Sequence, residues 1–201
     1  MPLPRRAVFF FASLLTACGG SSPGGEAPGE PVECTGFGDW QQSAYVLPYT
    51  VGESYRVNQA NCSGFGHSDF WLYGYDFDMP IGTVVTAARS GVVAHAQDGA
   101  RDGDRNRTNL ITIEHDDGTV ALYSHLTLNG VFVTIGQAVA AGDVIGLSGD
   151  TGNTGGLPHL HFSLHPCGAL PGQPGTGSCH SIPVNFRNTT QNPLGLRDNR
   201  T

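Results

Sequence analysis

The chain has 201 residues, enough for one globular domain of about 150 residues with extensions. Its formal net charge at pH 7 is −7 and its ten basic residues are all Arg, with no basic cluster, which argues against a nucleic acid as the partner. The 29 Gly residues suit the tight turns of an all-β protein and do not suit a helical bundle.

Residues 1–17 have the pattern of an export signal. Arg5 and Arg6 precede an apolar run at 7–17 that is too short for a stable membrane-spanning helix. The run ends in Leu15-Thr16-Ala17-Cys18, which is similar to a bacterial lipobox, where the signal is cut before a Cys that becomes acylated. The alternative is an ordinary cleaved signal with a chance Cys; the small residues before Cys18 favour the lipoprotein.

The next two segments are predicted to lie outside the main domain. Residues 18–32, which begin with the lipidated Cys18, are rich in Gly, Ser, Pro and Glu and cannot bury a core, so we predict a flexible tether. Residues 33–65 form an N-terminal extension, in which loosely alternating aromatic and aliphatic residues predict one or two short strands packed on the edge of the domain.

Four further Cys residues predict two disulfides, because an exported protein with an even number of Cys usually pairs them. Four Cys allow three connectivities. We favour Cys34 with Cys62 and Cys167 with Cys179, because each pair brackets one terminal extension. A Cys-rich metal site is a poor alternative, since the sequence has no Cys-x-x-Cys.

From residue 73 onward the sequence predicts short antiparallel strands. Apolar or alternating runs are separated by Gly, Pro and Asp turns, and Asp116-Asp117-Gly118 is a hairpin signal between two of them. The expected strands cover 75–79, 83–87, 91–96, 110–115, 120–125, 131–135, 139–140 and 143–147. Residues 98–109 are expected to be a solvated loop. We predict a β-sheet core at 66–165 and an irregular C-terminal extension at 166–201.

The stretch at 157–164 contains the histidine pair His159 and His161. In a β-strand this spacing puts both imidazoles on one face, while Leu160, Phe162 and Leu164 lie on the other. Two imidazoles held side by side on a strand suit a metal ligand paired with a general base. A bare His-x-His is weak evidence by itself, so the rest of the chain must supply the partners.

Four segments together resemble the lysostaphin/LytM-type zinc endopeptidases that cut bacterial peptidoglycan. They are Gly66-His67-Ser68, Tyr75-Asp76-Phe77, Tyr123-Ser124-His125-Leu126 and Pro158-His159-Leu160-His161-Phe162. The resemblance covers residues 66–164, about half the chain. It implies an all-β fold with an antiparallel sandwich or groove core, here carrying short irregular extensions at both ends.

The resemblance also implies the site residues. The family binds one Zn²⁺ per domain through residues that correspond here to His67, Asp76 and His161. Two imidazoles and a carboxylate are an ordinary catalytic zinc set that leaves the fourth position for water. The family's two remaining histidines, here His125 and His159, flank the metal as catalytic residues, and either could be the general base.

The first zinc motif departs from the common pattern, which places the His four residues before the Asp. That position here is Leu72, which cannot bind zinc, whereas His67 lies nine residues before Asp76. The segment looks like a family variant with longer spacing, in which a short excursion over residues 68–73 returns the ligand to the site.

The resulting prediction is a monomeric zinc metalloendopeptidase that acts on peptidoglycan peptides and touches the membrane only through its lipid anchor. Its expected location is the cell envelope, at the outer membrane or in the periplasm if the cell is Gram-negative. The alternative is an inactive LytM-like domain that binds cell wall or activates an amidase; five assignable site residues favour catalysis. A serine hydrolase is disfavoured, because no Gly-x-Ser-x-Gly occurs.

Overall fold

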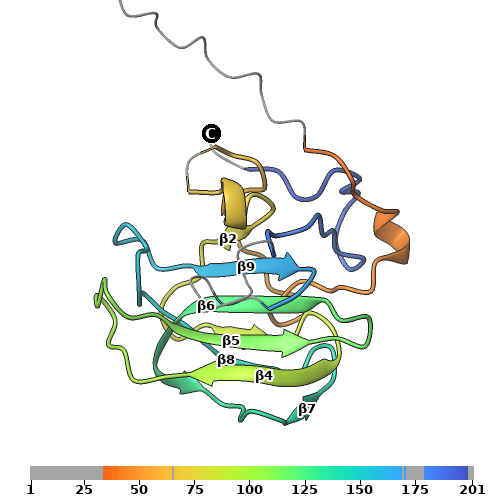
Figure 1. The fold of residues 1–201 in the computed structure, drawn as a ribbon. Helices are drawn as coiled ribbons and strands as arrows, with labels where there is room; N and C mark the ends of the chain where they lie inside the picture. The colour runs from red at the N-terminus through yellow and green to blue at the C-terminus, as the bar shows by residue number, and fades with distance from the viewer. Residues whose placement is uncertain (1–33, 65, 169, 171–178, 199–201) are drawn as a thin grey trace, which may run out of the picture. The chain divides into compact units, whose positions relative to one another are not determined.

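The computed structural model describes residues 34–64, 66–168, 170 and 179–198. Their regular structure is β-sheet with two short 3-10 turns (Figure 1). The strands are β1 (Val57–Gln59), β2 (Tyr75–Phe77), β3 (Val84–Thr86), β4 (Gly91–Gln97), β5 (Asn109–Glu114), β6 (Val120–Val131), β7 (Ala138–Val139), β8 (Val144–Ser148) and β9 (Leu160–His165); the turns are η1 (Trp40–Gln42) and η2 (Asp69–Trp71). No helix within these ranges is long and apolar enough to cross a bilayer.

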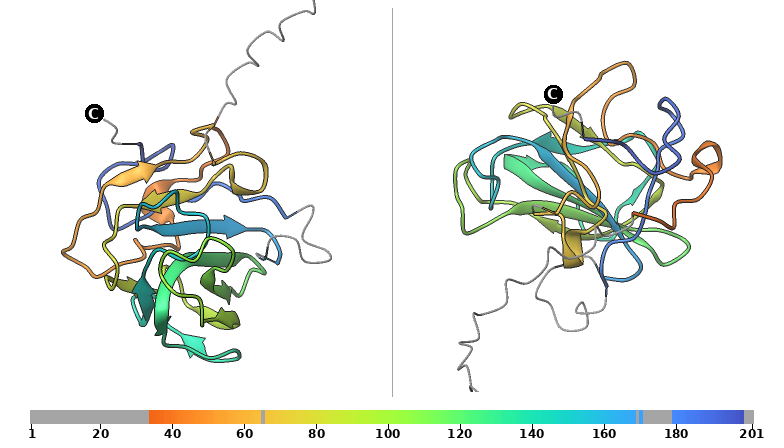
Figure 2. Two further views of the ribbon diagram at one scale, coloured as in Figure 1. Left: turned by 90° about the vertical axis from the view of Figure 1, so that its left-hand side faces the viewer. Right: turned by 90° about the horizontal axis from the view of Figure 1, so that it is seen from above.

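All the strand pairings are antiparallel, in the order β1-β2-β9-β6-β5-β4-β7; off this path, β8 pairs with β6 and β3 pairs with β8. The twelve-residue strand β6 pairs with β5 and β9 through its first half and with β8 further along. Figure 2 shows the same strands from one side and from above. The predicted all-β, antiparallel fold is confirmed. β1, in the N-terminal extension, is an edge strand.

Period-two alternation along β2 and β9 separates the core from the opposite face of these strands. Tyr75 and Phe77 of β2 and Phe162 of β9 are fully buried in the aromatic core. Phe186, from the C-terminal extension, packs on them with ring centroids 5.6 Å from Tyr75 and 5.7 Å from Phe162. Asp76 of β2 and His161 of β9 therefore point away from this core, and for His161 this is the face that the alternation at 157–164 predicted.

The face that bears the histidines is itself covered, by the 3-10 turn η2. Phe70 packs against His165 at 4.5 Å between ring centroids, and Trp71 packs edge-to-face against His161 at 4.9 Å. The C-terminal extension holds this turn in place, since the Ser181 amide donates to the carbonyl of Phe70. Every residue of β9 is consequently buried, on both faces of the strand.

Both predicted disulfides are present. Cys34 is bonded to Cys62 and Cys167 to Cys179, with Cα atoms 6.0 and 5.5 Å apart. For loops of 28 and 12 residues the chain-entropy relation gives about 3–4 kcal/mol of stabilisation each, through constraint of the unfolded chain. The predicted lipidation site, Cys18, and the tether lie outside the described residues.

Candidate metal centre and catalytic site

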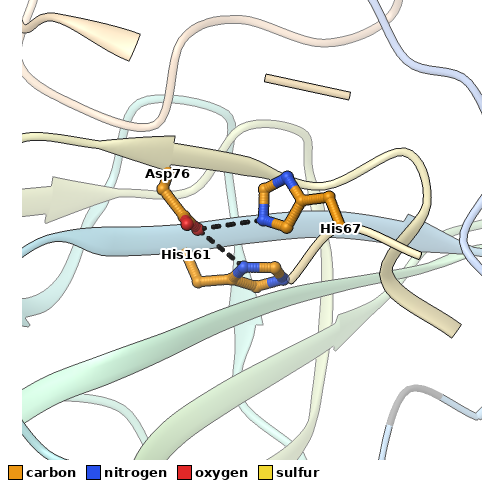
Figure 3. Close-up of side chains that lie close together, drawn as sticks. All are labelled: His67, Asp76 and His161. Atoms are coloured by element: carbon orange, nitrogen blue, oxygen red, sulfur yellow. Dashed lines mark hydrogen bonds and ion pairs between the residues drawn. The ribbon is translucent and has the colours of Figure 1, made fainter. Parts of the chain in front are cut away.

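The loop before η2, strand β2 and the distant strand β9 bring His67, Asp76 and His161 together (Figure 3). Asp76 of β2 and His161 of β9 are direct cross-strand partners, so sheet register places their side chains side by side. His67 arrives from the loop before η2. All three side chains are buried, with 2% to 8% of each residue exposed.

The ligand atoms have the spacing that a zinc ion needs. Asp76 Oδ1 lies 3.2 Å from His67 Nε2 and 2.8 Å from His161 Nδ1, and all the candidate ligand atoms lie within 4.8 Å of one another. Ligands about 2.0–2.1 Å from a tetrahedral zinc are about 3.3 Å from one another. The two imidazole nitrogens and the carboxylate oxygen therefore fit the predicted metal.

The hydrogen bond on the far side of the His67 ring supports this fit. Nδ1 lies 2.9 Å from the carbonyl oxygen of Ala60, which can only accept, so Nδ1 carries the proton. In the neutral ring Nε2 then presents a lone pair to the Asp76 carboxylate, and two such acceptors face each other favourably when a cation lies between them. Burial raises the pKa of Asp76, but the hydrogen bond with His161 Nδ1 and the charge of the neighbouring imidazoles outweigh it and hold that pKa well below its usual range.

The excursion between His67 and Asp76 wraps tightly around these rings. The Leu72 carbonyl in this excursion accepts a hydrogen bond at 2.6 Å from the backbone amide of Cys62, which is itself disulfide-bonded. The Gly74 amide donates to the carbonyl of Trp71. A Cβ placed on Gly74 would lie 2.8 Å from Cε1 of His161 and 3.2 Å from Nε2 of His67. The longer spacing is therefore accommodated by a close turn that only glycine permits.

His125 and His159 lie beside this cluster, as predicted. Their ring centroids are 4.6 Å apart, and His159 Nε2 is 3.7 Å from Asp76 Oδ1. Each ring donates its Nδ1 proton to a backbone carbonyl, His125 to Thr151 at 2.6 Å and His159 to Leu157 at 2.7 Å. In the neutral tautomer each Nε2 is then free to accept a proton. Burial, with His159 and His161 nearby, lowers the pKa of His125 to about 3.

A β-bulge aims His125 at the site. Asn109 of β5 pairs with Leu126 of β6 whereas Leu110 pairs with Ser124, so His125 is an extra residue on its strand. Its backbone is left-handed, with φ +67°, which is uncommon for a residue with a side chain.

Two buried polar residues that the sequence did not single out hold this bulge. The Thr151 hydroxyl accepts a hydrogen bond from the backbone amide of Asn109 at 3.0 Å and donates one to the Leu126 carbonyl at 2.7 Å. The Asn109 side-chain amide donates to the carbonyls of Ala100 and Thr127. Asn109 and Thr151 are both fully buried, and we call this pair the Asn109–Thr151 hub. Neither Asn109 nor Thr151 carries a spacing signal that could have identified it beforehand.

The remaining buried histidines have structural partners. His115 Nδ1 donates to the Ser90 carbonyl, and burial lowers its pKa. His165 donates to the Cys179 carbonyl and accepts from the Ser163 hydroxyl, and burial lowers its pKa to about 4. These two rings are neutral packing residues.

Comparison of the sequence with known protein families gives a match that covers most of the site. Residues 71–173, just over half the chain, match Peptidase family M23. Four of the five predicted site residues fall in that range, and His67 precedes it.

Among similar proteins, peptidoglycan DD-endopeptidase ShyA of Vibrio cholerae is 41% identical over 91 residues, which are 45% of this chain and 19% of that protein. Lysostaphin of Staphylococcus staphylolyticus is 39% identical over 106 residues, 49% of this chain and 21% of that protein. The catalytic domain of lysostaphin from Staphylococcus simulans, as a solved structure, shares 34% identity over 60% of this chain and 75% of that one, with a TM-score of 0.38. The chain thus spans about a fifth of the length of the two curated relatives. The match over residues 71–173 confirms the resemblance seen in the sequence, and the chain belongs to peptidase family M23.

Proposed function

We propose that this protein is a zinc metalloendopeptidase that hydrolyses amide bonds in peptidoglycan peptides. The observation that carries the proposal is the convergence of His67, Asp76 and His161, with two further histidines beside them. Membership of a peptidase family supports the reaction. The substrate class is supported by similarity to proteins named as a peptidoglycan DD-endopeptidase and as lysostaphin.

In this proposal His67, Asp76 and His161 hold one Zn²⁺. When bound, the ion would supply Lewis acidity for the scissile carbonyl and would acidify water. His125, neutral and fixed by Thr151, presents Nε2 as a proton acceptor, and His159, fixed by Leu157, presents a second such nitrogen. One of the pair takes the proton, and the imidazolium that forms can stabilise developing negative charge. The Trp71 ring packs beside His161 at this site.

We further propose that the protein is exported and held at the cell envelope by a lipid on Cys18. The lipobox at 15–18 and the polar segment after it support this location. Two disulfides agree with an oxidising compartment outside the cytoplasm. The tether would let the catalytic domain reach the cell wall from the membrane surface.

The test is metal content measured beside a cell-wall digestion assay. His67→Ala should lose zinc and hydrolysis together, because two remaining ligands hold a catalytic zinc poorly. His125→Ala and His159→Ala should keep most of the zinc while activity falls by about 100-fold or more, since these groups move protons and hold charge.

Leu72→Ala is the control, because the residue stands at the common ligand position without being able to bind metal; it should keep zinc and activity. Full zinc occupancy and activity in His67→Ala would contradict the ligand assignment. Wild-type protein with neither zinc nor activity would favour the non-catalytic binding domain instead.

A further inference from the structure

The catalytic histidines are bordered by two loops, 98–108 before β5 and 149–159 before β9. Because β5 and β9 both run antiparallel to β6, the two loops emerge at the same end of the sheet (Figure 1). Backbone bonds join them: the Gly103 amide donates to the Asp150 carbonyl at 2.8 Å and the Gly152 amide to the Asp104 carbonyl at 2.7 Å. The pair forms one platform beside the site.

Arg105 reaches across from the first loop of this platform to the second. Its Nη1 donates to the Thr154 hydroxyl at 2.7 Å. A Cβ placed on Gly156 would lie 3.0 Å from its Nη2, so the guanidinium lies directly against the glycine backbone. The next residue, Leu157, supplies the carbonyl that orients His159. Arg105 is therefore held against the loop whose Thr151 and Leu157 carbonyls orient His125 and His159.

The positive charge of Arg105 is not neutralised by a direct ion pair within the described part of the chain. Other arginines do form such pairs: Arg56 with Asp78, Arg89 with Asp116 and Asp117, and Arg107 with Asp104. Asp150 accepts from the Thr154 hydroxyl and not from the guanidinium. Arg105 thus keeps an exposed cation with free donors beside the site of a chain whose net charge is −7.

We propose that Arg105 binds a free carboxylate on the substrate close to the scissile bond, and that it selects anionic peptides over neutral ones at this site. The guanidinium fork matches a carboxylate with two parallel hydrogen bonds. In a chain whose net charge is −7, a cation without a carboxylate partner next to this loop favours the binding of a substrate carboxylate there. This inference rests on the proposed peptidase function and narrows its substrate class.

The test compares cross-linked muropeptides with the same muropeptides after their carboxylates have been amidated with ammonia and a carbodiimide. Wild-type protein should cleave the free acids with a kcat/KM about 10-fold higher, the size expected for a charge-assisted hydrogen bond. Arg105→Gln should lose that preference, mainly through a higher KM for the acids, and should cleave the amidated peptides as the wild type does.

Arg107→Gln is the matched control, since Arg107 lies on the same loop but is paired with Asp104. It should keep the wild-type preference, and all three proteins should contain equal zinc. Cleavage of both substrates with the same ratio in wild type and Arg105→Gln would overturn this inference alone. Zinc-loaded wild-type protein that cleaves neither would overturn the proposed function, and this inference with it.

Discussion

At the scale of single residues, backbone carbonyls set the chemistry of the histidines. Three rings in the site donate the Nδ1 proton to a main-chain oxygen and keep Nε2 as a lone pair that can bind a metal or accept a proton: His67 to Ala60, His125 to Thr151 and His159 to Leu157. Such bonds fix both the tautomer and the ring orientation. The segments that supply these carbonyls therefore fix the position of each ring nitrogen, although the histidines themselves could be identified from the sequence.

Gly74 offers a test at this scale. Gly74→Ala would place a methyl group 2.8 Å from the His161 ring and 3.2 Å from the His67 ring, too close for either to keep its place. Displacing two proposed ligands should weaken zinc binding by about 10- to 100-fold. Chelator competition measures this. Gly38→Ala, where the added Cβ has no atom within 4 Å, should bind zinc as the wild type does; equal affinity in both variants would contradict the tight-turn account.

At the scale of elements, the decisive feature is the irregularity in β6. A regular strand would alternate faces through residues 124–126, and the bulge at His125 breaks this alternation to present the ring beside His159. The left-handed backbone there is unfavourable by itself, so the surrounding hydrogen bonds must maintain it. Asn109 and Thr151 supply those bonds.

Thr151→Val tests the role of the bulge. The substitution keeps the shape but leaves the Asn109 amide and the Leu126 carbonyl without their buried partner, which should lower the free energy of unfolding by about 2 kcal/mol. Because His125 then loses its alignment, kcat should also fall, by about 10-fold or more. Denaturant unfolding and hydrolysis rates measure the two effects. Thr151→Ser restores the hydroxyl and should recover both; a Val variant with unchanged kcat would separate the bulge from catalysis.

At the scale of the whole molecule, the terminal extensions support the site as well as the core. The disulfide at Cys62 lies beside the amide that binds Leu72, in the excursion that carries His67. The disulfide at Cys179 lies at the carbonyl that holds His165, which packs against Phe70. Both extensions thus brace the segment between His67 and β2, one from each end of the chain.

The proposed lipid anchor gives a prediction for the full-length protein. Cys18→Ser should move the protein from the membrane fraction to the soluble fraction, because each acyl methylene buried in a bilayer contributes about 0.8 kcal/mol and the variant has none. Fractionation of cells that express either form measures the shift. Cys34→Ser serves as the control, since it removes a different Cys and should stay with the membrane. Membrane association that survives Cys18→Ser would reject the anchor.

Much of the site could be predicted from the sequence because its signals are local. Alternation along a strand depends only on neighbouring residues, so Asp76, His159 and His161 could be assigned to a face before the fold was known. The pairing of the four Cys of the domain followed from their positions around the extensions. His125 and His67 depended on the family resemblance, since neither the bulge nor the nine-residue spacing is readable from periodicity.

The sequence by itself determined the strand composition of the chain, the faces of β2 and β9, and the residues with the chemistry to hold a metal. Only the tertiary structure decided how those residues meet. Sheet register set Asp76 against His161, and the Asn109–Thr151 hub turned His125 toward His159. The loop platform holds Arg105 against Thr154, without a direct ion pair to any residue that the structure describes. These outcomes depend on contacts between segments up to 85 residues apart, such as Asp76 with His161, and no local pattern encodes them.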